Sequence, residues 1–269
     1  MPVRVETFSR IEDAERALSA NQAARFFGGG TILMRAVNEG DQSFDTLVRL
    51  TDPAFAEIRP EGVRITLGAG VTMNQVMASP DLAFLAPVAR SVGGPAVRST
   101  ASVGGNLYAA APYGDFATAL LALDATLTFA GQAGAPMPID AFMRERDRHA
   151  NRIVSAVSIE RPRETAAFRW LKVSRVKPKG LAVLSIAAHL PRSGGAIRVA
   201  YGNMGPTPVR VAAVEQALQG AQLTEQGIGP ALAAATQGLS PPSDSLASDW
   251  YRREVAPVHL KRLLLGQTG

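Results

Sequence analysis

Two short glycine-rich segments carry the residue types best suited to binding a ligand through the main chain. In the first, Gly28, Gly29 and Gly30 stand in succession between a strand-like run and Thr31. Because glycine has no Cβ, its amides can approach a ligand closely, and Thr31 can cap a following turn whose N-terminus attracts anions. The segment favours an anion-binding loop, with a plain tight turn as the alternative.

The second segment, TASVGGNLYAAAPYGDFATALLALDA, begins with small residues and runs into an apolar stretch that keeps one acid near its start, Asp115. Ser102, Gly104, Gly105 and Asn106 offer amides and short polar groups without bulk. Asp115 can accept a hydrogen bond from a sugar hydroxyl, or it can be the N-cap of the helix that follows. We therefore expect this backbone to lie against a large anionic cofactor whose other side is held by the first segment.

Other binding and catalytic motifs are incomplete or missing from the sequence. Gly68 and Gly70 follow a strand-like run and imitate a dinucleotide fingerprint, but Met73 occupies the place of the third glycine. A plain strand-to-helix turn is therefore the better interpretation. There is no P-loop lysine, no G-x-S-x-G and no pair of metal carboxylates, and we single out no catalytic residue.

Composition excludes several classes of site. The 269 residues include no cysteine, which rules out disulfides, thiolate metal sites and cysteine-ligated iron–sulfur clusters in this chain. His149, His189 and His259 are far apart in the sequence, so we expect no metal site. The net charge of +5 comes without a Lys/Arg run interleaved with aromatic residues, which argues against nucleic-acid binding.

Hydropathy predicts no membrane span. The N-terminus has no apolar signal region, and no stretch reaches about 18 uninterrupted apolar residues. We expect a cytoplasmic chain, or a periplasmic one only if a signal-bearing partner exports it.

The elements that must position these residues follow from capping and periodicity. Ser9 with Glu12 and Thr72 with Gln75 form capping boxes, each of which predicts a helix. A polar hinge at 161–165 is followed by three strands of an antiparallel sheet and then by helices. The predicted strands are 24–27, 44–50, 62–67, 125–131, 153–159, 167–174, 181–190 and 196–205. The predicted helices are 10–19, 31–36, one beginning at 73, 81–92, 115–124, 210–219, 224–237 and 249–265.

Taken together, the two segments resemble a known family. ARFFGGGTILM is similar to the first flavin loop, A-G-G-T-[DN]-L, of the FAD-binding medium subunit of molybdenum hydroxylases, the family of xanthine dehydrogenase, aldehyde oxidase and carbon monoxide dehydrogenase. VRSTASVGGNLYAAAPYGDFATALLALDA resembles the second loop, [RK]-x-x-A-[ST]-[VIL]-G-G-N, and its P-x-x-D-x-x-P-x-L-x-A-L-[DG]-A tract. WLKVSR and YGNMGPTPVRV resemble two further signatures, so the likeness covers nearly the whole chain in order.

The resemblance implies an α+β fold of two domains. Residues 1–161 would form a PCMH-type FAD-binding domain of two α+β subdomains, with the flavin extended between them. Residues 166–269 would form a smaller domain of the carbon monoxide dehydrogenase flavoprotein type, a three-stranded antiparallel sheet packed on a helix bundle.

It also implies roles for individual residues. The first loop would cover the diphosphate mainly through main-chain amides, the second would approach the cofactor from the other subdomain, and Asp115 would hold an adenosine hydroxyl. Lys172 would lie near the flavin ring, where a cation stabilises the charge of reduction; a surface lysine on a strand edge is the alternative. Val154 would touch the ring, and Val92 would line the same cavity. The implied cofactor-binding residues are Phe27, Gly28, Gly29, Gly30, Thr31, Ile32, Leu33, Met34, Val92, Ser102, Val103, Gly104, Gly105, Asn106, Asp115, Val154 and Lys172.

Three residues depart from the family pattern. Ile32 stands where Asp or Asn is usual, Gly180 where an acidic residue is common, and Thr118 where the tract has a second proline. Because main-chain donors do not depend on side-chain identity, we expect FAD binding to survive these changes.

With this resemblance, the absence of cysteine implies that the iron–sulfur clusters lie on other chains. A molybdenum hydroxylase oxidises substrate at a molybdopterin centre and passes electrons through [2Fe-2S] clusters to FAD, and this chain can hold no such cluster. The resemblance implies a small iron–sulfur subunit and a large molybdopterin subunit on separate chains, in a heterotrimer or its dimer. The external electron acceptor would be NAD, a quinone, oxygen or another protein.

Two alternatives stay open. A stand-alone FAD-dependent oxidoreductase of the vanillyl-alcohol-oxidase-like fold needs a substrate base or a covalent flavin tether, and no His or Cys lies near the loops to serve as one. A scaffolding subunit that has lost flavin is disfavoured by the intact second loop.

Overall fold

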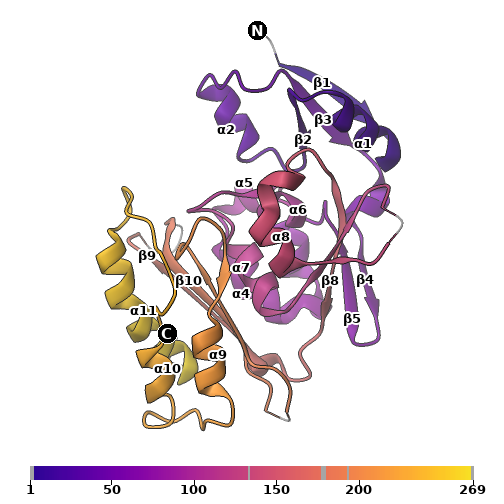
Figure 1. Cartoon of the computed structure of the whole chain (residues 1–269). Coiled ribbons are helices and arrows are strands. Elements are labelled where there is room, and N and C mark those ends of the chain that lie inside the picture. Colours follow the sequence, from indigo (N-terminus) through magenta and orange to yellow (C-terminus); the bar gives the residue numbers. More distant parts are fainter. Residues whose placement is uncertain (1–2, 133, 177–179, 193, 268–269) are drawn as a thin grey trace.

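The computed structural model describes residues 3–132, 134–176, 180–192 and 194–267. Its strands form three separate sheets that follow one another along the chain (Figure 1). Helices pack on each of them, so the fold is α+β, as the sequence predicted. Among the helices of the described ranges, none is both long enough and apolar enough to cross a bilayer.

The N-terminal part is a small parallel sheet with two helices: β1 (Arg4–Phe8), α1 (Ile11–Ala20), β2 (Ala24–Phe27), α2 (Leu33–Asn38) and β3 (Thr46–Leu50). The strand order is β1-β3-β2. Ala14 and Leu18 lie one helical turn apart and bury α1 against the sheet. The predicted capping box at the start of α1 is wrong: Arg10 is the N-cap residue, and no side chain caps the helix there.

The middle part is an antiparallel sheet of order β4-β5-β8-β6-β7, covered by short helices. Its strands are β4 (Ile58–Glu61), β5 (Arg64–Gly68), β6 (Thr126–Phe129), β7 (Met137–Pro138) and β8 (Val154–Glu160). Its α-helices are α3 (Met73–Ala78), α4 (Ala86–Ser91), α5 (Pro95–Arg98), α6 (Val103–Tyr108), α7 (Asp115–Ala122) and α8 (Ile139–Glu145). Its 3₁₀ turns are η1 (Pro53–Ala56), η2 (Pro80–Leu85) and η3 (Arg146–His149).

Two helix predictions in this part have different outcomes. The capping box at Thr72 is confirmed, because its hydroxyl accepts from the Gln75 amide while the Gln75 side chain accepts from the Thr72 amide. The single helix predicted over 81–92 is instead η2 followed by α4. Pro80 and Pro87 each stand in the first turn of one of these segments, a position that tolerates proline, and Leu82 has non-helical backbone angles.

The C-terminal part is an antiparallel sheet with helices on one face. Following the 3₁₀ turn η4 (Thr165–Ala167), its strands are β9 (Phe168–Ser174), β10 (Ala182–His189), β11 (Arg198–Gly202) and β12 (Val209–Arg210), in the order β12-β11-β10-β9. The three predicted strands are present, and the two-residue β12 adds a fourth at the edge. The helices are α9 (Ala212–Leu218), α10 (Gly229–Ala233) and α11 (Asp249–Leu264). α10 is shorter than the predicted 224–237 because Pro230 fits only the first turn of a helix.

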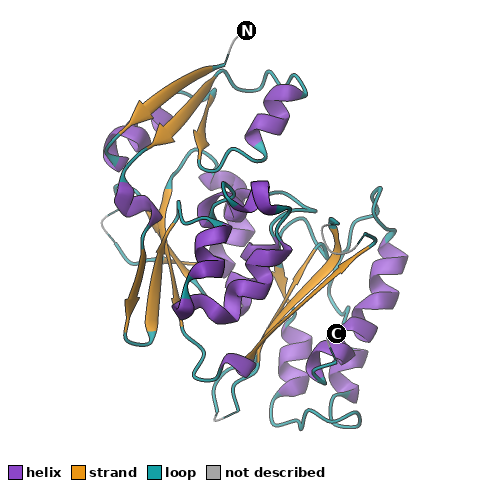
Figure 2. Cartoon of the chain, turned by 180° about the vertical axis from the view of Figure 1, so that it is seen from behind, coloured by secondary structure: helices purple, strands orange, loops and turns teal. Residues whose placement is uncertain are grey.

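Helix α7 joins the middle part to the C-terminal sheet. All eight of its residues are buried, which explains why its sequence is apolar on every side. It packs against α4 and α6 on one side and against β10 and β11 on the other, while α9–α11 lie beyond the sheet (Figures 1 and 2). This packing carries the N-terminus of α7, and with it Asp115, toward β9 and β10.

Candidate functional site

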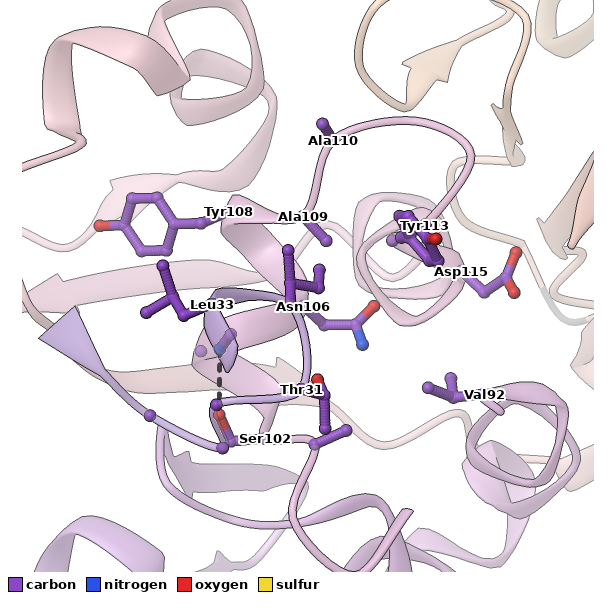
Figure 3. A pocket seen from close by; sticks show the side chains of 18 of the residues that line it. Thr31, Leu33, Val92, Ser102, Asn106, Tyr108, Ala109, Ala110, Tyr113 and Asp115 are labelled. Atoms are coloured by element: carbon purple, nitrogen blue, oxygen red, sulfur yellow. Dashed lines mark hydrogen bonds between the residues drawn. The ribbon is translucent and has the colours of Figure 1, made fainter. Parts of the chain in front are cut away.

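A cavity of about 580 Å³ lies where the three parts of the molecule meet. Figure 3 shows side chains from the first and second glycine segments around this one pocket. The sequence-predicted residues that line it are Gly28, Gly29, Gly30, Thr31, Ile32, Leu33, Val92, Ser102, Gly104, Gly105, Asn106, Asp115, Val154 and Lys172. Three other predicted residues do not line the cavity. The Phe27 ring packs on Gly30, Met34 is exposed on α2, and Val103 is buried in the core.

The first glycine segment follows β2 and packs directly on the second segment. A Cβ built on Gly29 would overlap the carbonyl oxygen of Thr100, and Gly30 has a positive φ of 70°. Within the described residues, none of the backbone amides of 28–32 donates a hydrogen bond to a protein acceptor. The segment therefore places a row of unused donors at the cavity wall, where no side chain at 28–30 blocks access.

The second segment uses its amides differently. It forms the start of α6, where the Ser102 hydroxyl accepts from the Gly105 amide at 3.1 Å. The amides of Val103 and Gly104 donate to carbonyls of the strand-to-helix turn before α3, at 2.8 and 2.7 Å, and the Asn106 amide donates within α6. The amides that the sequence suggested for a cofactor thus donate within the protein, and the segment contributes a surface without bulk.

Asp115 and Lys172 form a buried ion pair at the cavity wall. Asp115 Oδ2 accepts from Lys172 Nζ at 2.6 Å, and Nζ also donates to the Ser91 carbonyl at 2.9 Å. Burial raises the pKa of Asp115, and the Lys172 ammonium offsets part of that rise. Lys172 is therefore not a surface lysine, and Asp115 is not the N-cap of α7, a place taken by Gly114.

The ion pair also restricts the roles implied by the resemblance. Those roles put Asp115 at the adenosine end of an extended dinucleotide and Lys172 at its flavin end. Since the two side chains are in direct contact, they lie at one place on the cavity wall and not at its two ends.

Several cavity residues have no signal in the sequence. Four arginines reach the wall from β2, α2, η3 and the segment before β8, namely Arg25, Arg35, Arg146 and Arg152. With Lys172 they face only two carboxylates among the lining residues described, Asp115 and Asp147. Such an excess of positive charge favours an anionic ligand. The arginines are scattered in the sequence, so only the fold brings them together.

Tyr113 is a further residue that the sequence did not indicate. Its hydroxyl accepts from Arg35 Nη1 at 2.6 Å. This contact joins α2 of the first part to the loop that precedes α7, and both residues line the cavity.

The three departures from the family pattern have distinct surroundings. Ile32 is half-exposed at the cavity wall, and nothing in the structure explains the change. A Cβ on Gly180 would overlap the Val176 carbonyl oxygen, so there is no room for a side chain at this position of the cavity lining. The Thr118 amide donates to the Gly114 carbonyl at 3.2 Å, a bond in α7 that a proline would remove.

The described residues offer no metal centre as a second candidate site. Over the described ranges, no three His, Cys, Asp or Glu side chains gather closely enough to hold an ion.

Comparison with known proteins agrees with this geometry. Residues 2–162 match the family model of the FAD binding domain in molybdopterin dehydrogenase, and residues 169–266 match that of the CO dehydrogenase flavoprotein C-terminal domain. A putative xanthine dehydrogenase FAD-binding subunit of Escherichia coli K12 is 26% identical, covering 94% of this chain and 92% of its own. The glyceraldehyde dehydrogenase medium chain of Sulfolobus acidocaldarius is also 26% identical, over 95% and 94%.

Solved structures show the same fold. Quinoline 2-oxidoreductase from Pseudomonas putida 86 matches with a TM-score of 0.88 and 25% identity, covering 99% of this chain and 96% of that one. Carbon monoxide dehydrogenase from Hydrogenophaga pseudoflava shares the fold, with a TM-score of 0.86, 24% identity and coverage of 98% and 96%. Because the first family model spans more than half of the chain, the chain belongs to the FAD-binding flavoproteins of molybdopterin dehydrogenases and is a subunit of an oxidoreductase.

Proposed function

We propose that this chain is the electron-transfer subunit of a molybdenum hydroxylase complex and that the cavity holds its FAD. When bound, FAD supplies the redox chemistry, taking electrons from [2Fe-2S] clusters of a partner chain and passing them to an external acceptor. The observation that carries the proposal is the row of unused amides at 28–32 beside a cavity rich in cations.

In this proposal each group of residues has a defined task. The amides of 28–32 hold the diphosphate, because a chain of main-chain N–H groups without side chains is suited to a tightly bound anion. Ser102, Gly104, Gly105 and Asn106 form the adjoining surface, where small side chains leave room for the cofactor. Val92 and Val154 supply apolar contact for a ring system, and Lys172 supplies a hydrogen-bond donor.

The absence of cysteine supports the proposed partners. With no cysteine to ligate a cluster, the chain depends on other subunits for the path that delivers electrons. We propose a small [2Fe-2S] subunit and a large molybdopterin subunit, in a heterotrimer or its dimer. The domain bounds of 1–161 and 166–269 and a cytoplasmic location remain predictions of the sequence.

Titration of the purified full chain with FAD tests the cavity. We expect stoichiometric binding, a flavin spectrum that stays with the protein on gel filtration, and a higher melting temperature. At FAD concentrations of 100 times Kd, the added stability should be about 2.7 kcal/mol. A chain that neither retains nor takes up FAD would overturn the proposal.

Reconstitution separates this function from that of a stand-alone flavoenzyme. The FAD-loaded chain should turn over no substrate by itself and should be reduced only when iron–sulfur and molybdenum subunits are added with a substrate. Turnover of a substrate by the chain alone would favour the stand-alone oxidoreductase.

A further inference from the structure

The two helices of the first part are held in place very differently. Helix α1 buries Ala14 and Leu18, and its Glu15 carboxylate accepts from the Ile153 amide of the middle part at 2.8 Å. Helix α2 has no buried residue, and Figure 1 shows it standing apart from α1. Since tertiary packing supplies most of the stability of a helix in a protein, α2 is the helix of this part that can move away at the lower cost.

Helix α2 nevertheless forms part of the cavity wall. Leu33 and Arg35 line the cavity from α2, and the loop before α7 lines it with Ala110, Pro112 and Tyr113 (Figure 3). Within the described residues, the only hydrogen bond that joins α2 to another part of the molecule is the one from Arg35 Nη1 to the Tyr113 hydroxyl, at 2.6 Å. The Arg35 side chain is 61% exposed, so this bond lies at the mouth of the cavity, where water can replace it.

A glycine stands on each side of α2. Gly30 precedes the helix with a φ of 70°, and Gly40 follows it with a φ of 83°. Because glycine adopts positive and negative φ with similar ease, these two residues can absorb the change of backbone angles when a short segment swings. A Cβ built on Gly40 would meet no atom within 4 Å, so nothing packs against the backbone there.

We propose that α2 is a lid over the cavity, hinged at Gly30 and Gly40 and latched by the hydrogen bond from Arg35 to Tyr113. The inference rests on the proposed function in taking FAD as the ligand that the lid admits and retains. The latch consists of protein atoms alone, so it slows the entry and the release of the ligand equally and leaves the affinity unchanged. A residue that bonds the ligand behaves differently, because its loss speeds release without speeding entry.

Tyr113→Phe tests the latch, because it removes one hydroxyl and keeps the ring. Stopped-flow quenching of FAD fluorescence gives the rate of uptake by the full chain, and the recovery of fluorescence on dilution gives the rate of release. We expect both rates to rise by about threefold to tenfold while Kd stays within about twofold. Unchanged rates, or faster release with unchanged uptake, would overturn the lid.

Glu39→Gln is the matched control for this measurement. Glu39 directly follows α2 and accepts from the same Arg35 at 2.7 Å, but it does not join α2 to the loop before α7. Both rates should therefore equal those of the unaltered chain. Rates raised as much as in Tyr113→Phe would show that any loss of a partner of Arg35 has this effect, which contradicts the latch.

A covalent latch tests the lid from the opposite direction. The sequence contains no cysteine, so in a chain carrying Arg35→Cys and Tyr113→Cys a flexible bismaleimide can join only these two positions. FAD loaded before the reaction should stay bound through a dilution that empties the same variant without the cross-link. Release at the rate of the variant without the cross-link would overturn the lid and leave the proposed function in place, whereas an unaltered chain that takes up no FAD would overturn both.

Discussion

The two glycine segments that meet at the cavity differ in how they use their hydrogen-bonding groups. Residues 28–32 leave five consecutive amides without an acceptor in the described chain, whereas the amides of residues 103–106 all donate within the protein. An exposed or cavity-facing amide costs little while water can reach it, but a row of them held open by packing is suited to an anion. The first segment is therefore suited to binding an anion, whereas the second segment stabilises the part of the fold that shapes the cavity.

Two buried cations, Lys172 and Arg252, also differ in how many of their hydrogen-bond donors have an acceptor in the protein. Among the described residues, Lys172 has two acceptors for its three N–H groups, whereas Arg252, fully buried in α11, uses all its donors inside the protein. The Arg252 guanidinium bonds the carbonyls of Val183, Pro242 and Ala247 and both oxygens of Asp244. A cation whose donors are all used stabilises the fold, whereas a cation with a spare donor at a cavity wall is available to a ligand.

The largest expected effect is a loss of stability in the variant Arg252→Met. This change removes the donor of three carbonyls and of Asp244, including the bond from α11 to Val183 in β10, so the free energy of unfolding should fall by about 3–5 kcal/mol. Urea unfolding measures the loss, and the FAD affinity of the folded chain should not change.

Arg253→Met is the matched control for that measurement. Arg253 is the next residue in α11 and makes one bond, to the Leu239 carbonyl at 2.9 Å. Its loss should cost about 1 kcal/mol. Equal losses for the two variants would contradict the conclusion that the five donors of Arg252 stabilise the fold.

The next largest expected effect is a loss of FAD affinity in the variant Gly29→Ala. The added Cβ would overlap the Thr100 carbonyl oxygen, so the first segment must move away from the second. Overpacking of this kind costs about 1–3 kcal/mol, and we expect FAD affinity to fall by about tenfold to hundredfold. Gly94→Ala is the control, since Gly94 has no atom near its Cβ position and a negative φ. If both variants bind FAD equally, the close approach of the two segments is irrelevant to binding.

The sequence was sufficient for elements whose cause is local. Helix α7 was predicted over 115–124 because its apolar run is continuous, and the Gly28–Gly30 segment was found because a missing Cβ is visible in the sequence itself. Two helix predictions failed where a proline divided or shortened the helix, at Pro87 and Pro230.

The parts of the site that escaped prediction depend on distant packing. Asp115 and Lys172 are 57 residues apart, and only the burial of α7 against β10 brings them into contact. Arg35 and Tyr113 meet across 78 residues for the same kind of reason. The free amides of 28–32 and the used amides of 103–106 were likewise indistinguishable in sequence, because both segments are glycine-rich and begin a helical turn.

The smallest expected effect comes from Ser102→Ala, and it examines the second segment directly. Ser102 lines the cavity, but its hydroxyl caps α6 through the Gly105 amide. Thr72→Ala removes an equivalent cap from α3, at a residue outside the cavity lining. Both variants should lose about 1 kcal/mol of unfolding free energy, and both should keep FAD affinity within about threefold. A tenfold loss of affinity in Ser102→Ala alone would show that the second segment bonds the cofactor, and the division between the two segments would then be wrong.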